Sequence, residues 1–247
     1  MIEKIEYEVK YNVFEEEEIN EDIIYEKDFT PKLVWPNRHL NGYFWPLKDK
    51  VPHFAKYIES LIHFTGEDSN ILLLEFLNKA ESYDLATKKH LCDYFFPLLE
   101  RNKNNQYFDQ KRIFSVKIRS YFRKVLKELQ REYPSDYHYY KWYGLFLNYK
   151  DSLDKLIIAN QLLNNSDDEV LIKIINYKVT RISNNVDQLL YTYLEKDVDR
   201  DIKELMETVT MVSCLKSKSD KENLMKVCND LTTRLTEYKI SMYALNK

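Results

Sequence analysis

Residues 109–132 read DQKRIFSVKIRSYFRKVLKELQRE, and their apolar side chains recur at intervals of three and four residues. This spacing predicts an α-helix, because residues three or four apart share one face at 3.6 residues per turn. We expect the helix to end before Pro134, since a proline ring cannot continue it. The predicted inward face consists of Phe114, Ile118, Tyr121, Phe122, Val125, Leu126 and Leu129.

Helical spacing recurs over the rest of the chain from residue 51 onward. Short polar turns such as Asn164–Ser166 and Ser183–Asn185 separate the segments, which favours antiparallel helix pairs. Asp151 and Asp167 precede two segments and are residue types that cap helix N-termini. The further helices are predicted at 51–64, 69–82, 84–101, 136–149, 151–164, 168–182, 185–195, 198–216 and 220–245.

The first fifty residues follow a different pattern. Residues 5–13 alternate apolar and polar side chains, which predicts a half-buried β-strand. Such a strand needs a partner, and residues 23–29, residues 32–35 and a second copy of the chain are the alternatives. We therefore predict a mainly all-α fold of antiparallel helix pairs, in an irregular bundle or short α-solenoid, with a small N-terminal β-strand or hairpin element. The predicted domains are an acidic strand arm with an aromatic, Pro-containing loop at 1–50 and a helical domain at 51–247, with one domain packed from both as the alternative.

Composition excludes several classes of function. The chain has 247 residues, of which 44% are hydrophobic and 31% charged, as in ordinary globular proteins. Its three scattered glycines exclude a P-loop and a dinucleotide-binding fingerprint, because both need glycine-rich loops. The three cysteines form no CxxC pair, so we expect buried thiols in a reducing compartment. There is no secretory signal and no apolar run near the roughly 18 residues of a membrane span, so a soluble, cytoplasmic protein is expected.

Positive charge is concentrated around the helix predicted at 109–132. Residues 101–131 contain ten Lys or Arg and two acidic residues, Asp109 and Glu128. At 100° per residue the basic side chains fall opposite the apolar ones, so helix 109–131 is predicted to be amphipathic and basic. This face has four alternative roles: pairing with the chain's own acidic residues 1–30, an acidic protein partner, nucleic acid, or an anionic membrane. The candidate binding residues are Arg112, Arg119, Arg123 and Lys127.

A second candidate site is the aromatic loop at residues 35–45. It contains Trp35, Arg38, His39, Tyr43 and Trp45, residue types that are enriched at the energetic centres of interfaces. The alternative is that these aromatic side chains pack into the helical body. A later aromatic run, Tyr133–Tyr149, has helical spacing and is predicted to be core.

The sequence contains no motif that supports a catalytic or metal-binding site. The histidines lack metal-site spacing, and His90 would point away from Cys92 on a helix. We therefore predict a non-enzymatic protein-binding function, of the adaptor or the inhibitor (immunity-protein-like) kind, with no metal and no cofactor. A nucleic-acid-binding module built on helix 109–131 and an enzyme with dispersed site residues are the alternatives. We expect a protein partner of acidic character and no membrane association; nucleic acid as partner and a homodimer through the C-terminal helix stay open.

Overall fold

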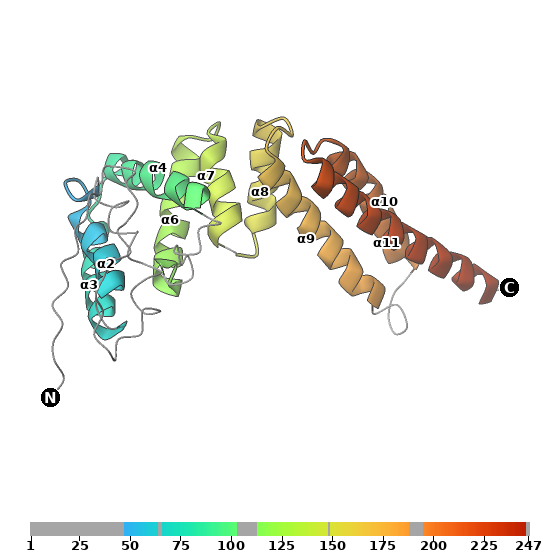
Figure 1. Cartoon of the computed structure of the whole chain (residues 1–247), viewed down its shortest axis with the longest axis horizontal. Coiled ribbons are helices and arrows are strands. Elements are labelled where there is room, and N and C mark those ends of the chain that lie inside the picture. The colour runs from blue at the N-terminus through green and yellow to red at the C-terminus, as the bar shows by residue number, and fades with distance from the viewer. Residues whose placement is uncertain (1–46, 64–65, 103–112, 148, 188–194, 246–247) are drawn as a thin grey trace, which may run out of the picture. The chain divides into compact units, whose positions relative to one another are not determined.

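The structure is a computed structural model that describes residues 47–63, 66–102, 113–147, 149–187 and 195–245 (Figure 1). Regular secondary structure in these residues is helical throughout, which confirms the prediction of a mainly α-helical fold for this part of the chain. The predicted N-terminal strand lies outside the described residues. In chain order the elements are α2 (Pro52–His63), α3 (Gly66–Ala80), α4 (Leu85–Asn102), α6 (Val116–Glu132), α7 (Tyr137–Trp142), the π-helical turn η2 (Tyr143–Leu147), α8 (Ser152–Leu162), α9 (Asp168–Asp187), α10 (Glu195–Ser213) and α11 (Lys218–Leu245).

The chain divides into two compact units, residues 1–125 and 126–247. Helices α2, α3, α4 and the first part of α6 belong to the first unit. The last turns of α6 and all later helices belong to the second. The boundary predicted near residue 50 stays a prediction, because the described residues begin only at Leu47.

The first unit has an aromatic core. Phe95 stacks on Phe122 with ring centroids 4.9 Å apart, and Phe54 meets both rings edge-on. All three side chains are fully buried, and each contributes about 1.5–3 kcal/mol through removal of its apolar surface from water. The Tyr57 hydroxyl donates to the Ile113 carbonyl at 3.3 Å and so ties α2 to the residues before α6.

The predicted inward face of the basic helix is confirmed. Phe114, Ile118, Phe122, Val125, Leu126 and Leu129 are buried and Tyr121 is half-buried. The helix ends at Glu132, two residues before Pro134, as predicted.

In the second unit, the end of α6 packs against α7. The Gln130 side-chain amide donates to the Tyr139 carbonyl at 3.0 Å, and the Tyr140 hydroxyl donates back to the Gln130 carbonyl at 3.4 Å. Tyr139, Trp142 and Tyr143 are buried, which confirms the core prediction for these residues of the aromatic run. Phe146 is half-buried, and Tyr133 is exposed, so the prediction is wrong for Tyr133.

Helices α9, α10 and α11 share one apolar core. Lys239 near the end of α11 pairs with Asp199 near the start of α10, and Lys221 near the start of α11 donates to the Ser213 carbonyl at the end of α10. These contacts show that α10 and α11 run antiparallel, side by side (Figure 1). The buried side chains of this core are Leu171, Ile175, Val179, Ile182, Val186, Val198, Leu205, Val212, Leu215, Cys228, Leu231 and Leu235.

Several predicted boundaries are wrong. The predicted helix 109–132 is not continuous, because Phe114 and Ser115 are not helical and α6 begins only at Val116. The predicted turn Ser183–Asn185 lies inside α9, which continues to Asp187 because Ile182 and Val186 extend its buried face. Residues 185–187 of the predicted helix 185–195 therefore belong to α9. The predicted helix 136–149 is two elements, since α7 passes into the π-helical turn η2 after Trp142.

Candidate functional site

The outward face of α6 is the candidate site. Lys117, Lys124 and Arg131 are exposed and follow one another at seven-residue intervals. Because a helix turns about 100° and rises about 1.5 Å per residue, these three residues lie within about 40° of one another and about 10.5 Å apart along the axis. We call Lys117, Lys124 and Arg131 the cationic stripe.

The cationic stripe has no acidic partner within the part of the chain that the structure describes. No hydrogen bond or ion pair to the Lys117 or Lys124 ammonium group is formed there. The Arg131 guanidinium Nε donates only to a carbonyl of its own helix, that of Lys127, at 3.3 Å. The three charges are therefore not balanced inside the described residues, and they face solvent.

The residues predicted as a binding face divide into different roles. Arg119 is half-buried, and its Nε donates to the Phe114 carbonyl at 3.0 Å, so its guanidinium lies on the flank of α6 near the helix start. Arg123 is half-buried. Arg112 lies outside the described residues. The sequence pattern places these residues on one arc together with Lys117, Lys124 and Arg131. Within the described residues, the exposed cations of that arc are Lys117, Lys124 and Arg131.

Lys127, the fourth predicted binding residue, is engaged inside the second unit. Its ammonium nitrogen is 2.9 Å from Asp151 Oδ2 and 5.6 Å from the centroid of the Tyr143 ring. The Tyr143 hydroxyl donates to the other oxygen of Asp151 at 2.7 Å. Lys127 thus joins α6 to the start of α8 by an ion pair and a cation–π contact.

Asp151 does not cap α8 in the way that its sequence position predicts. It occupies the N-cap position, but its side chain makes no capping hydrogen bond because both oxygens are taken by Tyr143 and Lys127. Partial burial favours the neutral acid, but the hydrogen bond from Tyr143 and the charge of Lys127 outweigh it and hold the pKa of Asp151 below its ordinary value.

The close approach of η2 and α8 positions this cluster. Gly144 is buried, and a Cβ at this position would lie 2.3 Å from Leu156 Cγ and 2.9 Å from the Ser152 carbonyl oxygen. The Ser152 hydroxyl accepts a hydrogen bond from the Tyr149 backbone N–H at 2.8 Å. Glycine therefore lets the π-helical turn pack directly on the first turn of α8.

A second ion pair ties α7 to the start of α9. Lys141 Nζ lies 2.8 Å from Asp167 Oδ2, and both side chains are largely buried. Asp167 Oδ1 accepts from the backbone N–H groups of Glu169 and Val170, which confirms its predicted role as an N-cap. Burial raises the pKa of Asp167, but the Lys141 contact and the two backbone hydrogen bonds outweigh burial and lower the pKa overall.

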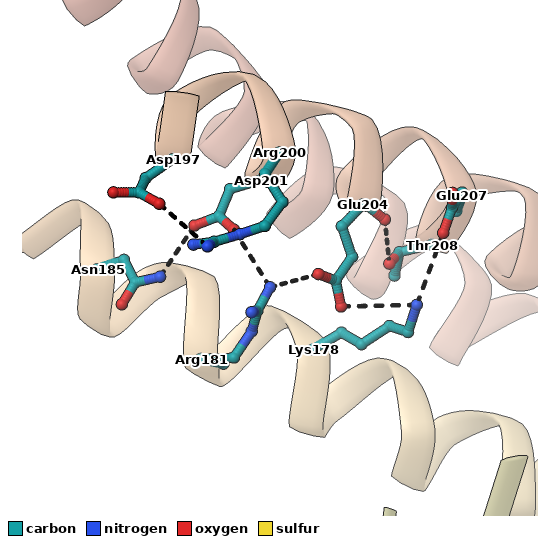
Figure 2. A network of polar contacts seen from close by, with 9 residues as sticks. All are labelled: Lys178, Arg181, Asn185, Asp197, Arg200, Asp201, Glu204, Glu207 and Thr208. Atoms are coloured by element: carbon teal, nitrogen blue, oxygen red, sulfur yellow. Dashed lines mark hydrogen bonds and ion pairs between the residues drawn. The ribbon is translucent and has the colours of Figure 1, made fainter. Parts of the chain in front are cut away.

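The most extensive polar network joins α9 to α10 (Figure 2). Its central residue is Asp201, whose side chain is fully buried. Arg181 and Asn185 of α9 donate to its two oxygens at 3.2 and 2.9 Å, and Arg200 of α10 donates at 3.3 Å. Arg181 also contacts Glu204. The other members drawn in Figure 2 are Lys178, Asp197, Glu207 and Thr208.

The Asp201 network fixes the pairing of two helices. Both Asp201 oxygens accept hydrogen bonds, two of them from donors on α9, so the buried carboxylate is satisfied and links the two helices. Asp201 is not among the residues predicted from the sequence to have a role. An available signal was the i, i+4 pair Arg181 and Asn185, which places two donors on one face of α9.

The aromatic loop cannot be compared with its prediction. Trp35, Arg38, His39, Tyr43 and Trp45 all lie outside the described residues, so their role as a recognition loop stays a prediction.

The cysteines do not support thiol chemistry at Cys92. Burial raises the pKa of Cys92 well above its ordinary value, so the thiol stays protonated. Cys228 is also buried, but Cys214 is exposed at the end of α10, so the prediction of a buried thiol is wrong for Cys214. Within the described ranges, no group of three or more His, Cys, Asp or Glu side chains is arranged to hold a metal ion.

Comparison with family models found no match, and comparisons with curated proteins and with solved structures found none either. Among the described helices, none has both the length and the apolar character needed to cross a membrane.

Proposed function

We propose that this chain is a non-enzymatic binding protein that holds an acidic protein partner on the outward face of α6. The observation that supports this is the cationic stripe, whose three exposed charges have no carboxylate partner among the described residues. Charges of one sign on an exposed face attract and orient a partner of the opposite sign. The kinds of protein that fit are an adaptor and an inhibitor that covers its target.

A nucleic-acid ligand would contact the same cations, but the neighbouring side chains favour a protein. Glu128 follows Lys124 by four residues and precedes Arg131 by three on α6, so it lies close beside the stripe. Duplex DNA has one charge for about every 1.7 Å of its length and would bring phosphates against this carboxylate. A protein surface can instead place a single acidic group opposite each cation.

Affinity capture with charge-reversed variants tests the proposal. The chain with Lys117→Glu and Lys124→Glu is compared with the natural sequence in extracts of the source cells. Lys117 and Lys124 are better sites for substitution than Arg119, because the Arg119 guanidinium donates a hydrogen bond to the Phe114 carbonyl. We expect at least one protein that the natural sequence captures to be lost from the variant.

A matched variant distinguishes the effect of the stripe residues from the effect of the change in net charge. Lys203 on α10 and Lys226 on α11 are exposed and unpaired within the described residues, so Lys203→Glu with Lys226→Glu changes net charge equally. We expect this control to capture the same proteins as the natural sequence. The proposal is wrong if the stripe variant retains every captured protein, or if both variants lose the same ones. The aromatic loop at 35–45 stays a predicted second contact surface.

A further inference from the structure

We infer that the cationic stripe recognises a partner α-helix that presents carboxylates at seven-residue intervals. The inference rests on the proposed function and names the shape of its partner. Its basis is the spacing of Lys117, Lys124 and Arg131, which lie on one continuous helix, so helix geometry alone fixes their separation.

The spacing of the three cations in the stripe equals that of residues seven apart on a second α-helix. Residues seven apart on any α-helix are about 10.5 Å apart along its axis and drift by about 20° around it. Acidic side chains at seven-residue intervals on a partner helix would therefore stay opposite Lys117, Lys124 and Arg131 over about 21 Å. Paired helices use charges at such positions to choose their partner and register.

The residues beside the stripe fit a helix better than a polyanion. Val116 is 76% exposed at the start of α6 and offers an apolar contact, while Ser120 is exposed and small enough to admit a neighbouring side chain. Glu128 lies beside Lys124 and Arg131 and would repel a continuous row of phosphates. A helix that carries isolated carboxylates between neutral residues can pair with the cations and place a neutral residue opposite Glu128.

Two synthetic peptides test the register. The first is an Ala- and Gln-rich helix of about 21 residues with three glutamates at seven-residue intervals, so that the glutamates span about 21 Å, as the stripe does. The second has the same composition, but its middle glutamate is moved to the opposite helix face. Binding of each labelled peptide to the full chain is measured by fluorescence anisotropy at low salt, because exposed ion pairs are screened by salt.

We expect the first peptide to bind about two- to fivefold more tightly than the second, the factor that one exposed ion pair supplies. Lys124→Glu should abolish this preference, and Lys203→Glu should keep it. Circular dichroism checks that both variants are folded. Equal affinity for the two peptides, no binding of the first, or tighter binding of a DNA duplex of similar length would each overturn the inference.

The two experiments distinguish failure of this inference from failure of the proposed function. If capture of a cellular partner depends on Lys117 and Lys124 while the two peptides bind equally, α6 is the binding surface but its partner is not a helix in this register. If capture does not depend on these lysines, the proposed function itself is wrong.

Discussion

The Tyr143 hydroxyl donates a 2.7 Å hydrogen bond to Asp151 Oδ1, while Lys127 pairs with the second oxygen of the same carboxylate. This contact joins the π-helical turn to the first residue before α8. It also removes Lys127 from the set of cations that face solvent without a partner. The position of Asp151 therefore explains why Lys127 forms an internal ion pair, whereas Lys117 and Lys124 have no carboxylate partner among the described residues.

Tyr143→Phe should destabilise the second unit by about 1–2 kcal/mol, because a buried hydroxyl that donates to a charged group is lost. Urea unfolding followed by circular dichroism measures the change. Tyr137→Phe is the matched control: Tyr137 is half-exposed, its ring stacks on His138, and the loss of its hydroxyl should change stability by less than about 0.5 kcal/mol. Equal losses in both variants would contradict the role of the Tyr143–Asp151 bond.

The lowered pKa values of Asp151 and Asp167 predict loss of stability in acid. A carboxyl group with a depressed pKa in the folded state binds its proton more weakly when folded, so its stabilisation is present above its ordinary pKa of 3.8 and is lost as pH falls through the folded value. Thermal unfolding at a series of pH values should show the melting temperature falling below about pH 4.

Asp167→Asn separates charge from helix capping in that experiment. Asparagine caps helices as well as aspartate does, but it cannot pair with Lys141 as an anion. The variant should be less stable at neutral pH and should show a shallower fall of melting temperature in acid. An unchanged dependence on pH would show that Asp167 does not contribute to it.

Asp201→Ala should cost about 2 kcal/mol, since it leaves Asn185 and two arginines without their buried acceptor. The cost stays below that of a fully buried ion pair because Arg181 and Arg200 are about half exposed and can turn to water. Asp199→Ala on the same helix removes only an exposed pair with Lys239 and should cost less than about 1 kcal/mol. Hydrogen exchange in α9 and α10 should accelerate for Asp201→Ala and not for Asp199→Ala.

Gly144→Ala should destabilise by about 1–3 kcal/mol through overpacking. The new Cβ would approach Leu156 Cγ to 2.3 Å and the Ser152 carbonyl oxygen to 2.9 Å, and the backbone oxygen cannot move aside as a side chain can. In a double-mutant cycle with Leu156→Ala, the two losses should be less than additive because the clash with Leu156 disappears. Strict additivity would show that Gly144 is not limited by this contact.

Native alkylation should label one cysteine of three. Cys214 is exposed, whereas Cys92 and Cys228 are buried and burial raises the pKa of both thiols. Mass spectrometry after brief iodoacetamide treatment should find the label on Cys214 in the folded chain and on all three after unfolding. Early labelling of Cys92 would contradict its burial in α4.

The sequence by itself determined the helices, because three- and four-residue spacing of apolar side chains requires only the period of the helix. Phe114, Ile118, Phe122 and Leu129 are buried as that period predicts. Pro134 and Asp167 marked a helix end and a helix start through local chemistry that needs no distant partner.

The tertiary structure alone decided which polar side chains are used inside the molecule. Lys124 and Lys127 are three residues apart and chemically alike, yet among the residues that the structure describes only Lys127 of the two contacts a carboxylate. That carboxylate is 24 positions further along the chain. The role of Asp201 likewise depends on tertiary packing, because its hydrogen-bond donors Arg181 and Asn185 come from a different helix, α9. Pairings of this kind depend on how helices pack, and packing brings together residues whose separation in sequence carries no periodic signal.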